Sequence, residues 1–211
     1  MKDFCKKWFS KEGLLKVFKS FVWVTLLVIL VDTVSKWVVQ TNLVNEGNSI
    51  TLIKDFLRIT LVHNTGASFG MGSSGEIGWR IFWIIVSVVL TGAITFVYIK
   101  YFKKFSTLQK ISLTLMIGGA FSNLIDRAFY WKATVGFDAV IDWIDFQFGS
   151  IDFAIFNLAD AALVIGVVIL IIIEVIDIIK EVRAKDKRGE YDIAPNAKKD
   201  EEKKENEEPK N

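Results

Sequence analysis

Two acidic residues, Asp142 and Asp160, lie just before and at the start of a long apolar segment late in the chain. The stretch that holds them, VIDWIDFQFGSIDFAIFNLAD, covers residues 140–160. A carboxylate at a bilayer is costly, so acids kept there usually have a function. Two facing carboxyl groups can share a proton and hydrolyse a peptide bond with water. These residues therefore predict acid–base chemistry at a membrane.

The rest of the composition limits the chemistry available. The chain has 211 residues, 52% of them hydrophobic, and its net charge of +2 gives no reason to expect a nucleic-acid partner. A single cysteine, Cys5, excludes an internal disulfide or a cysteine-based metal cluster, and a single histidine, His63, excludes a multi-histidine site. We therefore expect carboxylates, amides, hydroxyls and basic side chains to act without a metal or a cofactor.

Four segments are long enough to cross the roughly 30 Å hydrocarbon core of a bilayer, which needs about 20 helical residues. They cover residues 17–41, 77–99, 106–126 and 156–179. The first is not typical of a cleaved signal peptide, because it lacks a small-x-small exit and three more spans follow. We predict a membrane all-α fold with four transmembrane helices.

Segment 50–71 has a different pattern. ITLI and FLRITLVH alternate and are rich in β-branched residues, which predicts short strands, and NTGASFG is rich in turn residues. We expect a hairpin or small sheet here, an extracytoplasmic β element that lies on the membrane surface.

The distribution of lysine and arginine predicts the orientation. Residues 1–19 carry six lysines and the short loop 100–110 carries four, whereas segments 42–76 and 127–154 hold only two basic residues each. The positive-inside rule then places both termini and the 100–110 loop in the cytoplasm. Segments 42–76 and 127–154 are predicted to lie outside.

Three regions follow from this pattern. Residues 1–19 mix lysines with aromatic and apolar side chains, which is typical of an interfacial helix. Residues 20–183 form the four-span domain. Residues 184–211 are rich in lysine and glutamate with few apolar residues, which predicts a disordered, charged cytoplasmic tail.

Polar side chains recur at helical spacing inside the predicted spans, so members of each group share one helix face. The predicted topology brings the groups from three spans to the outer leaflet, which indicates one common site. The groups are Asp32 with Lys36, Asn123 with Asp126 and Arg127, and Asn157 with Asp160.

Each group also has a purely structural interpretation. Asp32 and Lys36 are typical of an ion pair that settles helix packing. Asn157 and Asp160 are typical of a capping box at a helix N-terminus. Arg127 is typical of a lipid-headgroup anchor. The spacing alone does not choose between these interpretations and a functional site.

Other residues are better explained by structure alone. Asp145 and Asp152 are interpreted as ordinary loop acids, and His63 as structural. Gly118 and Gly119 are predicted to be close-packing positions between helices.

The chain resembles the lipoprotein signal peptidases, bacterial signal peptidase II. The blocks that match, in the order found in that family, are VDTVSKW (31–37), HNTGASFGM (63–71), GGAFSNLIDR (118–127), VIDWIDF (140–146) and FNLADAALVIG (156–166). With the four-span topology they cover about residues 20–180. The resemblance implies a multi-pass aspartic endopeptidase of the bacterial plasma membrane that acts as a monomer among membrane lipids. Its implied substrates are lipidated prolipoproteins, cut just before a diacylglyceryl-modified cysteine.

By position, the resemblance implies a catalytic dyad of Asp142 and Asp160. The residues implied to line or support the site are Asp32, Lys36, Asn64, Asn123, Asp126, Arg127 and Asn157. Asp126 is the alternative dyad member, but the family pattern favours a supporting role in which it orders Arg127 or nearby backbone. Asp160, in the first turn of a helix, is expected to ionise first, and Asp142, on a loop, to hold the proton.

The chain departs from the family pattern in two places. The stretch 128–141 is longer than expected, and the charged tail is extra. Asp138 in the longer loop lies outside the motifs and is rejected as a dyad member.

Two other functions compete with hydrolysis. A small ion-coupled membrane transporter would use Asp32, Lys36 and Asp160 as a relay, but it needs polar residues at mid-membrane and along both leaflets. A non-catalytic scaffold would bind through the external loop, but it gives no reason for two aspartates embedded in motifs.

Overall fold

The computed structural model describes residues 15–16, 18–43, 45, 47–66, 77–129, 139–149 and 151–187. The chain forms two compact units, Met1–Leu170 and Ile171–Asn211. The predicted interfacial segment (up to residue 14), Asp138 and the tail from residue 188 lie outside the described residues.

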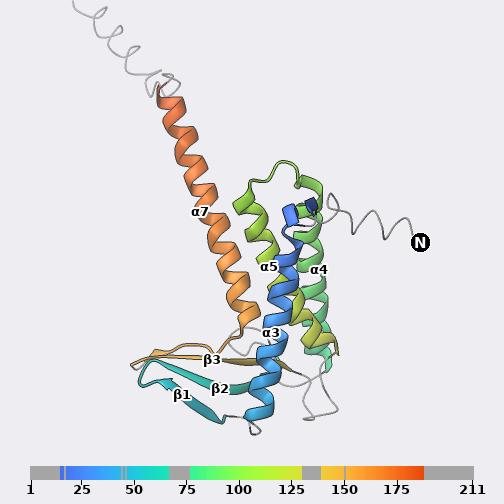
Figure 1. Ribbon diagram of the computed structural model, residues 1–211, viewed down its shortest axis with the longest axis vertical. Helices are drawn as coiled ribbons and strands as arrows, with labels where there is room; N and C mark the ends of the chain where they lie inside the picture. The colour runs from blue at the N-terminus through green and yellow to red at the C-terminus, as the bar shows by residue number, and fades with distance from the viewer. Residues whose placement is uncertain are drawn as a thin grey trace, which may run out of the picture. The chain divides into compact units, whose positions relative to one another are not determined.

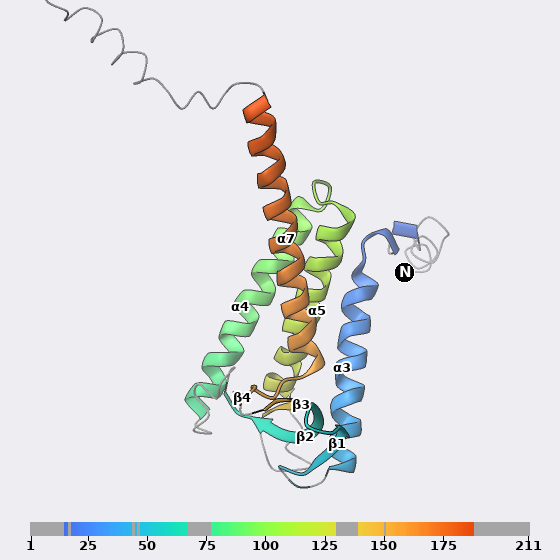
Figure 2. The ribbon, with the colours of Figure 1, turned by 90° about the vertical axis from the view of Figure 1, so that its left-hand side faces the viewer.

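The described residues contain four long helices and four strands (Figures 1 and 2). The helices are α3 (Val22–Asn42), α4 (Ile77–Tyr101), α5 (Thr107–Phe129) and α7 (Leu158–Lys187). The strands are β1 (Ser49–Ile53), β2 (Leu57–Asn64), β3 (Val140–Phe148) and β4 (Ile151–Asp152).

Helices stand at all four predicted spans, but only three of those described have the length and hydropathy to cross a membrane by themselves: Val22–Asn42, Gly78–Tyr101 and Leu158–Lys187. The helix α5 is long enough but more polar. Many of its polar side chains, such as those of Ser112, Ser122 and Asn123, are buried inside the protein. The polar character of α5 therefore reflects contacts with neighbouring elements.

Glycines let α5 approach two neighbouring helices closely, as the sequence predicted. A methyl group on Gly118 would lie 2.9 Å from Cβ of Val28 on α3. A methyl group on Gly119 would collide with the carbonyl oxygen of Ala159 at the start of α7. Small residues at these positions allow backbone-to-backbone packing of membrane helices.

The strands form one antiparallel sheet in the order β1-β2-β3-β4. The predicted hairpin in segment 50–71 is confirmed as β1 and β2. The prediction that Asp142 and Asp145 lie in a loop is wrong, because both residues lie on β3, which pairs with β2. The β-branched and aromatic residues of VIDWIDFQF are typical of a strand and were the missed signal.

The sheet packs over the C-terminal end of α3 (Figure 2). Val39 and Leu43 of this helical end form a buried cluster with Leu61 of β2 and Ile141 of β3. This contact fixes β3, and with it Asp142, against the helices of the first unit.

The helix α7 continues beyond the predicted end at residue 179 and reaches Lys187. The first four residues of the segment 184–211 are therefore helical and not disordered. Lysine, glutamate and alanine favour helix, and Lys185 pairs with Glu181 one turn earlier at 2.8 Å.

Candidate active site

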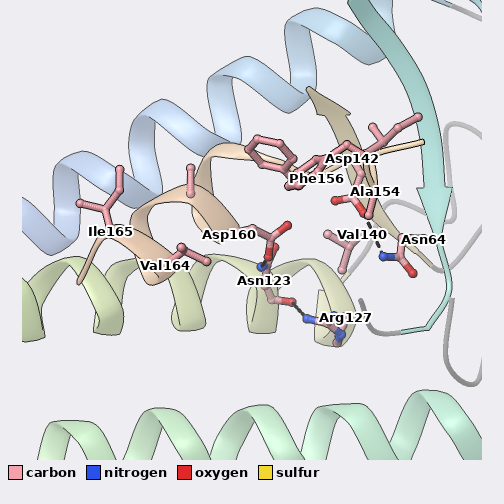
Figure 3. A pocket seen from close by; sticks show the side chains of 13 residues that line it. Asn64, Asn123, Arg127, Val140, Asp142, Ala154, Phe156, Asp160, Val164 and Ile165 are labelled. Atoms are coloured by element: carbon pink, nitrogen blue, oxygen red, sulfur yellow. Dashed lines mark hydrogen bonds between the residues drawn. The ribbon is translucent and has the colours of Figure 1, made fainter. Parts of the chain in front are cut away.

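A cavity of about 450 Å³ in the first unit receives the carboxylates of Asp142 and Asp160 (Figure 3). Asp142 lies on β3, and Asp160 lies in the first turn of α7. The lining consists of a polar group, Asn64, Asn123, Arg127, Asp142 and Asp160, and an apolar group, Val140, Phe153, Ala154, Ile155, Phe156, Ala161, Val164 and Ile165. Residues far apart in the sequence therefore meet at one hollow with two acids and one guanidinium.

Asp142 is held by two side-chain amides. Its Oδ1 accepts a hydrogen bond from Nδ2 of Asn157 at 2.7 Å, and its Oδ2 accepts one from Nδ2 of Asn64 at 2.9 Å. Asn64 is the last residue of β2, and its Oδ1 accepts the backbone N–H of Gly66 at 3.0 Å. The Asp142 carboxyl group is buried, and its orientation is fixed from both sides.

Burial raises the pKa of Asp142 to about 7, and the negative charge of Asp160 adds to the increase. Burial acts because a desolvated carboxylate is disfavoured relative to the neutral acid. The hydrogen bonds from Asn64 and Asn157 favour the ionised form and limit the shift. Asp142 can therefore hold or release a proton near neutral pH.

Asp160 forms the capping box that the spacing predicted. Its backbone N–H donates to Oδ1 of Asn157 at 2.9 Å, and its Oδ2 accepts the backbone N–H of Asn157 at 3.3 Å. Its Oδ1 accepts a third hydrogen bond from Nδ2 of Asn123 at 2.7 Å. The cap and the site are not alternatives here, since the cap itself holds the carboxylate toward the cavity.

Asn157 links the two acids. Its side chain is fully buried, and its Nδ2 donates both to Asp142 and, at 3.2 Å, to Oδ1 of Asn123. Its Oδ1 and backbone N–H bond to Asp160. One residue therefore sets the position of both carboxylates.

Behind Asn123 lies a buried charge cluster centred on Lys36. The Nζ of Lys36 lies 2.6 Å from Oδ2 of Asp32, 2.5 Å from Oδ2 of Asp126 and 3.2 Å from Oδ1 of Asn123. The predicted pair of Asp32 with Lys36 is present. Asp126, which was expected to order Arg127 or nearby backbone, forms an ion pair with Lys36 across the interface between α5 and α3.

Asp32 connects three helices. Its side chain is fully buried, its Oδ2 accepts a hydrogen bond from Oγ of Ser122 at 2.6 Å, and its Oδ1 accepts the backbone N–H of Ala159 at 2.9 Å. The second bond satisfies one of the free N–H groups at the start of α7. Asp32 thus holds the helix end that carries Asp160.

Arg127 closes the polar side of the cavity. Its Nη1 donates to the carbonyl oxygen of Asn123 at 3.2 Å, and its Nη2 donates to the carbonyl oxygen of Gly66 at 3.4 Å. Figure 3 shows its guanidinium beyond Asn123 at the polar side of the cavity.

The interpretation of Asp145 as an ordinary loop acid is wrong. It is buried on β3 and paired with Arg58 on β2, where Nη2 of Arg58 lies 2.9 Å from Oδ2 of Asp145. Sequence reasoning missed this pair because the partner is 87 residues away. Among the residues that the structure describes, no group of three or more His, Cys, Asp or Glu side chains is arranged to hold a metal ion.

This fold occurs in solved bacterial membrane enzymes. One such structure has a TM-score of 0.62 and 30% sequence identity, covering 74% of this chain and 87% of the other. A second has a TM-score of 0.60 and 29% identity, covering 72% of this chain and 89% of the other. The fold of this chain is therefore similar to that of solved bacterial membrane enzymes.

Sequence comparison identifies the family. The profile described as Signal peptidase (SPase) II matches residues 24–176. The lipoprotein signal peptidase of Staphylococcus carnosus (strain TM300) is 36% identical over 151 residues, which cover 72% of this chain and 87% of the relative. The chain belongs to the signal peptidase II family and is a membrane protease, as the sequence blocks indicated.

Proposed function

We propose that this chain removes signal peptides from diacylglyceryl-modified prolipoproteins, with Asp142 and Asp160 as an aspartic dyad. The observation that carries the proposal is the convergence of these two carboxyl groups on one cavity, both bonded to Asn157. The Staphylococcus carnosus relative, a lipoprotein signal peptidase, supports the choice of substrate.

The surroundings of Asp126 argue against its membership of the dyad. Its Oδ2 is bonded to Lys36 at 2.5 Å. Asp126 lines a separate cavity of about 90 Å³, together with Lys36, and it is absent from the lining of the larger cavity that holds Asp142 and Asp160. A structural role at the helix interface suits this position better than contact with a peptide.

In the proposed reaction, the Asp160 carboxylate accepts a proton from a water molecule that attacks the scissile carbonyl carbon. The protonated Asp142 donates its proton to the carbonyl oxygen, which gives a neutral tetrahedral intermediate with two hydroxyl groups on the former carbonyl carbon. As the C–N bond breaks, Asp160 passes the proton that it took from water to the leaving amine nitrogen, and one hydroxyl group returns a proton to Asp142 as the carboxylic acid product forms. One water molecule is consumed, and no covalent intermediate forms. The pKa of Asp142, raised to about 7 by burial and by the charge of Asp160, supports its role as the proton donor.

The apolar wall of the cavity suits a lipid-anchored substrate. Val164 and Ile165 on α7 line the cavity and are 57% and 52% exposed, so in a membrane they face lipid. Phe153 and Phe156 continue this wall on the side of the sheet. An acyl chain can lie against these side chains while Asn64 and Arg127 bind the peptide backbone or the ester region.

We place the site at the outer face of a bacterial plasma membrane, with four spans, both termini in the cytoplasm and the enzyme acting as a monomer. The lysine-rich connection between α4 and α5 supports this orientation, because it lies at the opposite end of these helices from the sheet (Figure 1). The positive-inside rule assigns such a connection to the cytoplasm.

The test is cleavage of a precursor whose cysteine carries a diacylglyceryl group. Asp142→Asn and Asp160→Asn should each lower the cleavage rate by about 10²–10⁴-fold, which is the usual contribution of a general acid or base. Asp55→Asn is the matched control, because Asp55 is exposed in the β1–β2 turn and its backbone φ of 57° suits asparagine.

Wild-type cleavage by either dyad variant would contradict the assignment. Equal cleavage of a precursor without the lipid would contradict the proposed substrate class.

A further inference from the structure

The pairing of β2 with β3 contains one extra residue on β2. Ile59 pairs with Ile144 and Val62 pairs with Asp142, so three steps along β2 match two steps along β3. The extra residue falls at Thr60 or Leu61, and both side chains are buried. A bulge of this kind re-aims the side chains that follow it.

The backbone at this bulge is well satisfied. The N–H of Leu61 donates to the carbonyl oxygen of Asn48 at 3.0 Å, and its carbonyl oxygen accepts the N–H of Gly47 at 2.9 Å. The side chain of Leu61 is fully buried in the cluster that joins the sheet to α3. The bulge is therefore a supported feature of the fold.

The bulge decides which side chain faces Asp142. Side chains alternate between faces along a strand, so Asp142 and Asp145, three residues apart, point to opposite faces. Arg58 and Asn64, six residues apart, would share a face on a regular strand. The bulge lets Arg58 bond to Asp145 while Asn64 bonds to Asp142. Val62 lies opposite Asp142 in the observed register. If the register before the bulge continued from Arg58, Leu61 would lie opposite Asp142 and the side chain of Asn64 would point to the other face of the sheet.

Three side chains hold Asp145 on the face away from Asp142. Its Oδ2 accepts hydrogen bonds from Nε of Arg58 at 3.0 Å and from Oγ1 of Thr60 at 2.6 Å, and Nη2 of Arg58 lies 2.9 Å from the same oxygen in an ion pair. Its Oδ1 accepts one from Nε2 of Gln147 at 2.5 Å. Burial alone disfavours the charge, but these bonds lower the pKa of Asp145, so the group is ionised.

We propose that Asp145, bonded to Arg58 and Thr60, locks the bulged register of β2 and β3 and thereby positions Asp142 for catalysis. A shift of β3 by one residue would turn a buried carboxylate away from its donors, which is strongly unfavourable. Asp145 touches neither the cavity nor the reacting atoms, so it is a positioning residue. The proposal rests on the proposed role of Asp142.

The hydrogen bonds of Asp145 affect Asp142 through the backbone of β3, which carries both residues. Three residues of strand, about 10 Å, separate Asp145 from Asp142. Between them, the N–H groups of Trp143 and Ile144 donate to the carbonyl oxygen of Phe156 at 3.0 and 2.8 Å. Phe156 directly precedes Asn157, so these bonds hold β3 beside the first amide that bonds to Asp142. The pairing of β3 with β2 holds it beside the second, Asn64.

The experiment compares Asp145→Asn with wild type in detergent, using a peptide that carries a diacylglyceryl cysteine. We expect kcat to fall by about 10–100-fold with KM changed less than about twofold, because the substrate contacts remain and the acid is misplaced. We also expect the fall in activity at high pH to begin at a higher pH. The bond from Asn64 lowers the pKa of Asp142, so weakening that bond raises it.

Other charges near Asp142 need to stay in place for this pH readout. The groups that face it are Asp160 and Arg127 at the cavity and Lys36 behind Asn123. None of these contacts Asp145, so a change in the pH profile reports the position of Asp142. Asp55→Asn again serves as the control, with the wild-type kcat and pH profile expected.

Three results would overturn the proposal: a kcat and pH profile equal to those of Asp55→Asn, a change in KM alone, or less folded protein with a normal kcat per folded molecule. If Asp145→Asn does not fold, Thr60→Val is the second test, with a fall in kcat of about 2–10-fold and a pH shift in the same direction. An unchanged Thr60→Val variant would then refute the lock.

Asp142→Asn in the same assay separates this inference from the proposed function. Loss of cleavage in Asp142→Asn with normal Asp145→Asn refutes only the lock. Normal cleavage by Asp142→Asn refutes the dyad itself.

Discussion

Replacement of Lys36 by methionine tests the buried charge cluster most directly. Methionine keeps an unbranched chain of similar length but removes the ammonium group that lies 2.6 Å from Asp32 and 2.5 Å from Asp126. The Lys36 side chain is only 4% exposed, and those of Asp32 and Asp126 are 0% and 8% exposed. The substitution therefore leaves two desolvated carboxyl groups without their cation.

Removal of one partner from a buried ion pair costs about 3–5 kcal/mol, because the remaining charge is uncompensated. The cost exceeds that of an exposed pair, which is roughly 0–1 kcal/mol. For a protein of this size each kcal/mol lowers the melting temperature by about 2–4 °C. Lys36→Met should therefore lower the melting temperature by roughly 6–20 °C.

The assay is thermal unfolding in detergent micelles at neutral pH, followed by tryptophan fluorescence. Lys180→Met is the matched control, because Lys180 forms an exposed pair with Asp177 at 3.1 Å. Its effect should stay within about 0.5 kcal/mol. Adding Asp126→Asn to Lys36→Met should recover roughly half of the loss, since one of the two unpaired acids is removed.

Equal melting temperatures for Lys36→Met and Lys180→Met would refute the reasoning. A double variant less stable than Lys36→Met alone would also refute it, because the cost would then not come from unpaired carboxylates.

Two further predictions concern the proton donor and the helix interface. The cleavage rate should fall as the pH rises through about 7, because the protonated form of Asp142 acts as the acid. Burial and the charge of Asp160 raise the pKa of this group to about 7. The measurement is a pH–kcat profile, and a rate that stays constant up to about pH 9 would contradict the prediction. Gly119→Ala should lower the free energy of unfolding by about 1–3 kcal/mol, because its methyl group meets the carbonyl oxygen of Ala159. Gly92→Ala, which has open space around it, should be neutral or slightly stabilising in the same unfolding assay.

Local patterns in the sequence were enough for several parts of the site. The three-residue spacing of Asn157 and Asp160 predicted a capping box, and both of its hydrogen bonds are present. The four-residue spacing of Asp32 and Lys36 predicted their ion pair. Helical periodicity and helix caps depend on neighbours within one turn, so a single segment contains the information that fixes them.

Strand pairing was decided by the tertiary structure. The hairpin of β1 and β2 was predictable because its strands adjoin in sequence, but β3 pairs with β2 from about 80 residues away and was taken for a loop. An edge strand presents free N–H and C=O groups along its whole length, and the fold decides which segment meets them. Asp142 therefore lies on a rigid strand, where the sequence alone suggested a loop.

The amino-acid sequence was sufficient to identify the polar residues that lie one helical turn apart and the motifs that place the chain in its family. The tertiary structure decided the partners of the charges. Lys36 meets Asp126 across 90 residues, and Arg58 meets Asp145 across 87. Such pairs form because burial forces each charge to find an opposite charge or a hydrogen bond in its immediate surroundings. Those surroundings exist only once helices and sheet have packed.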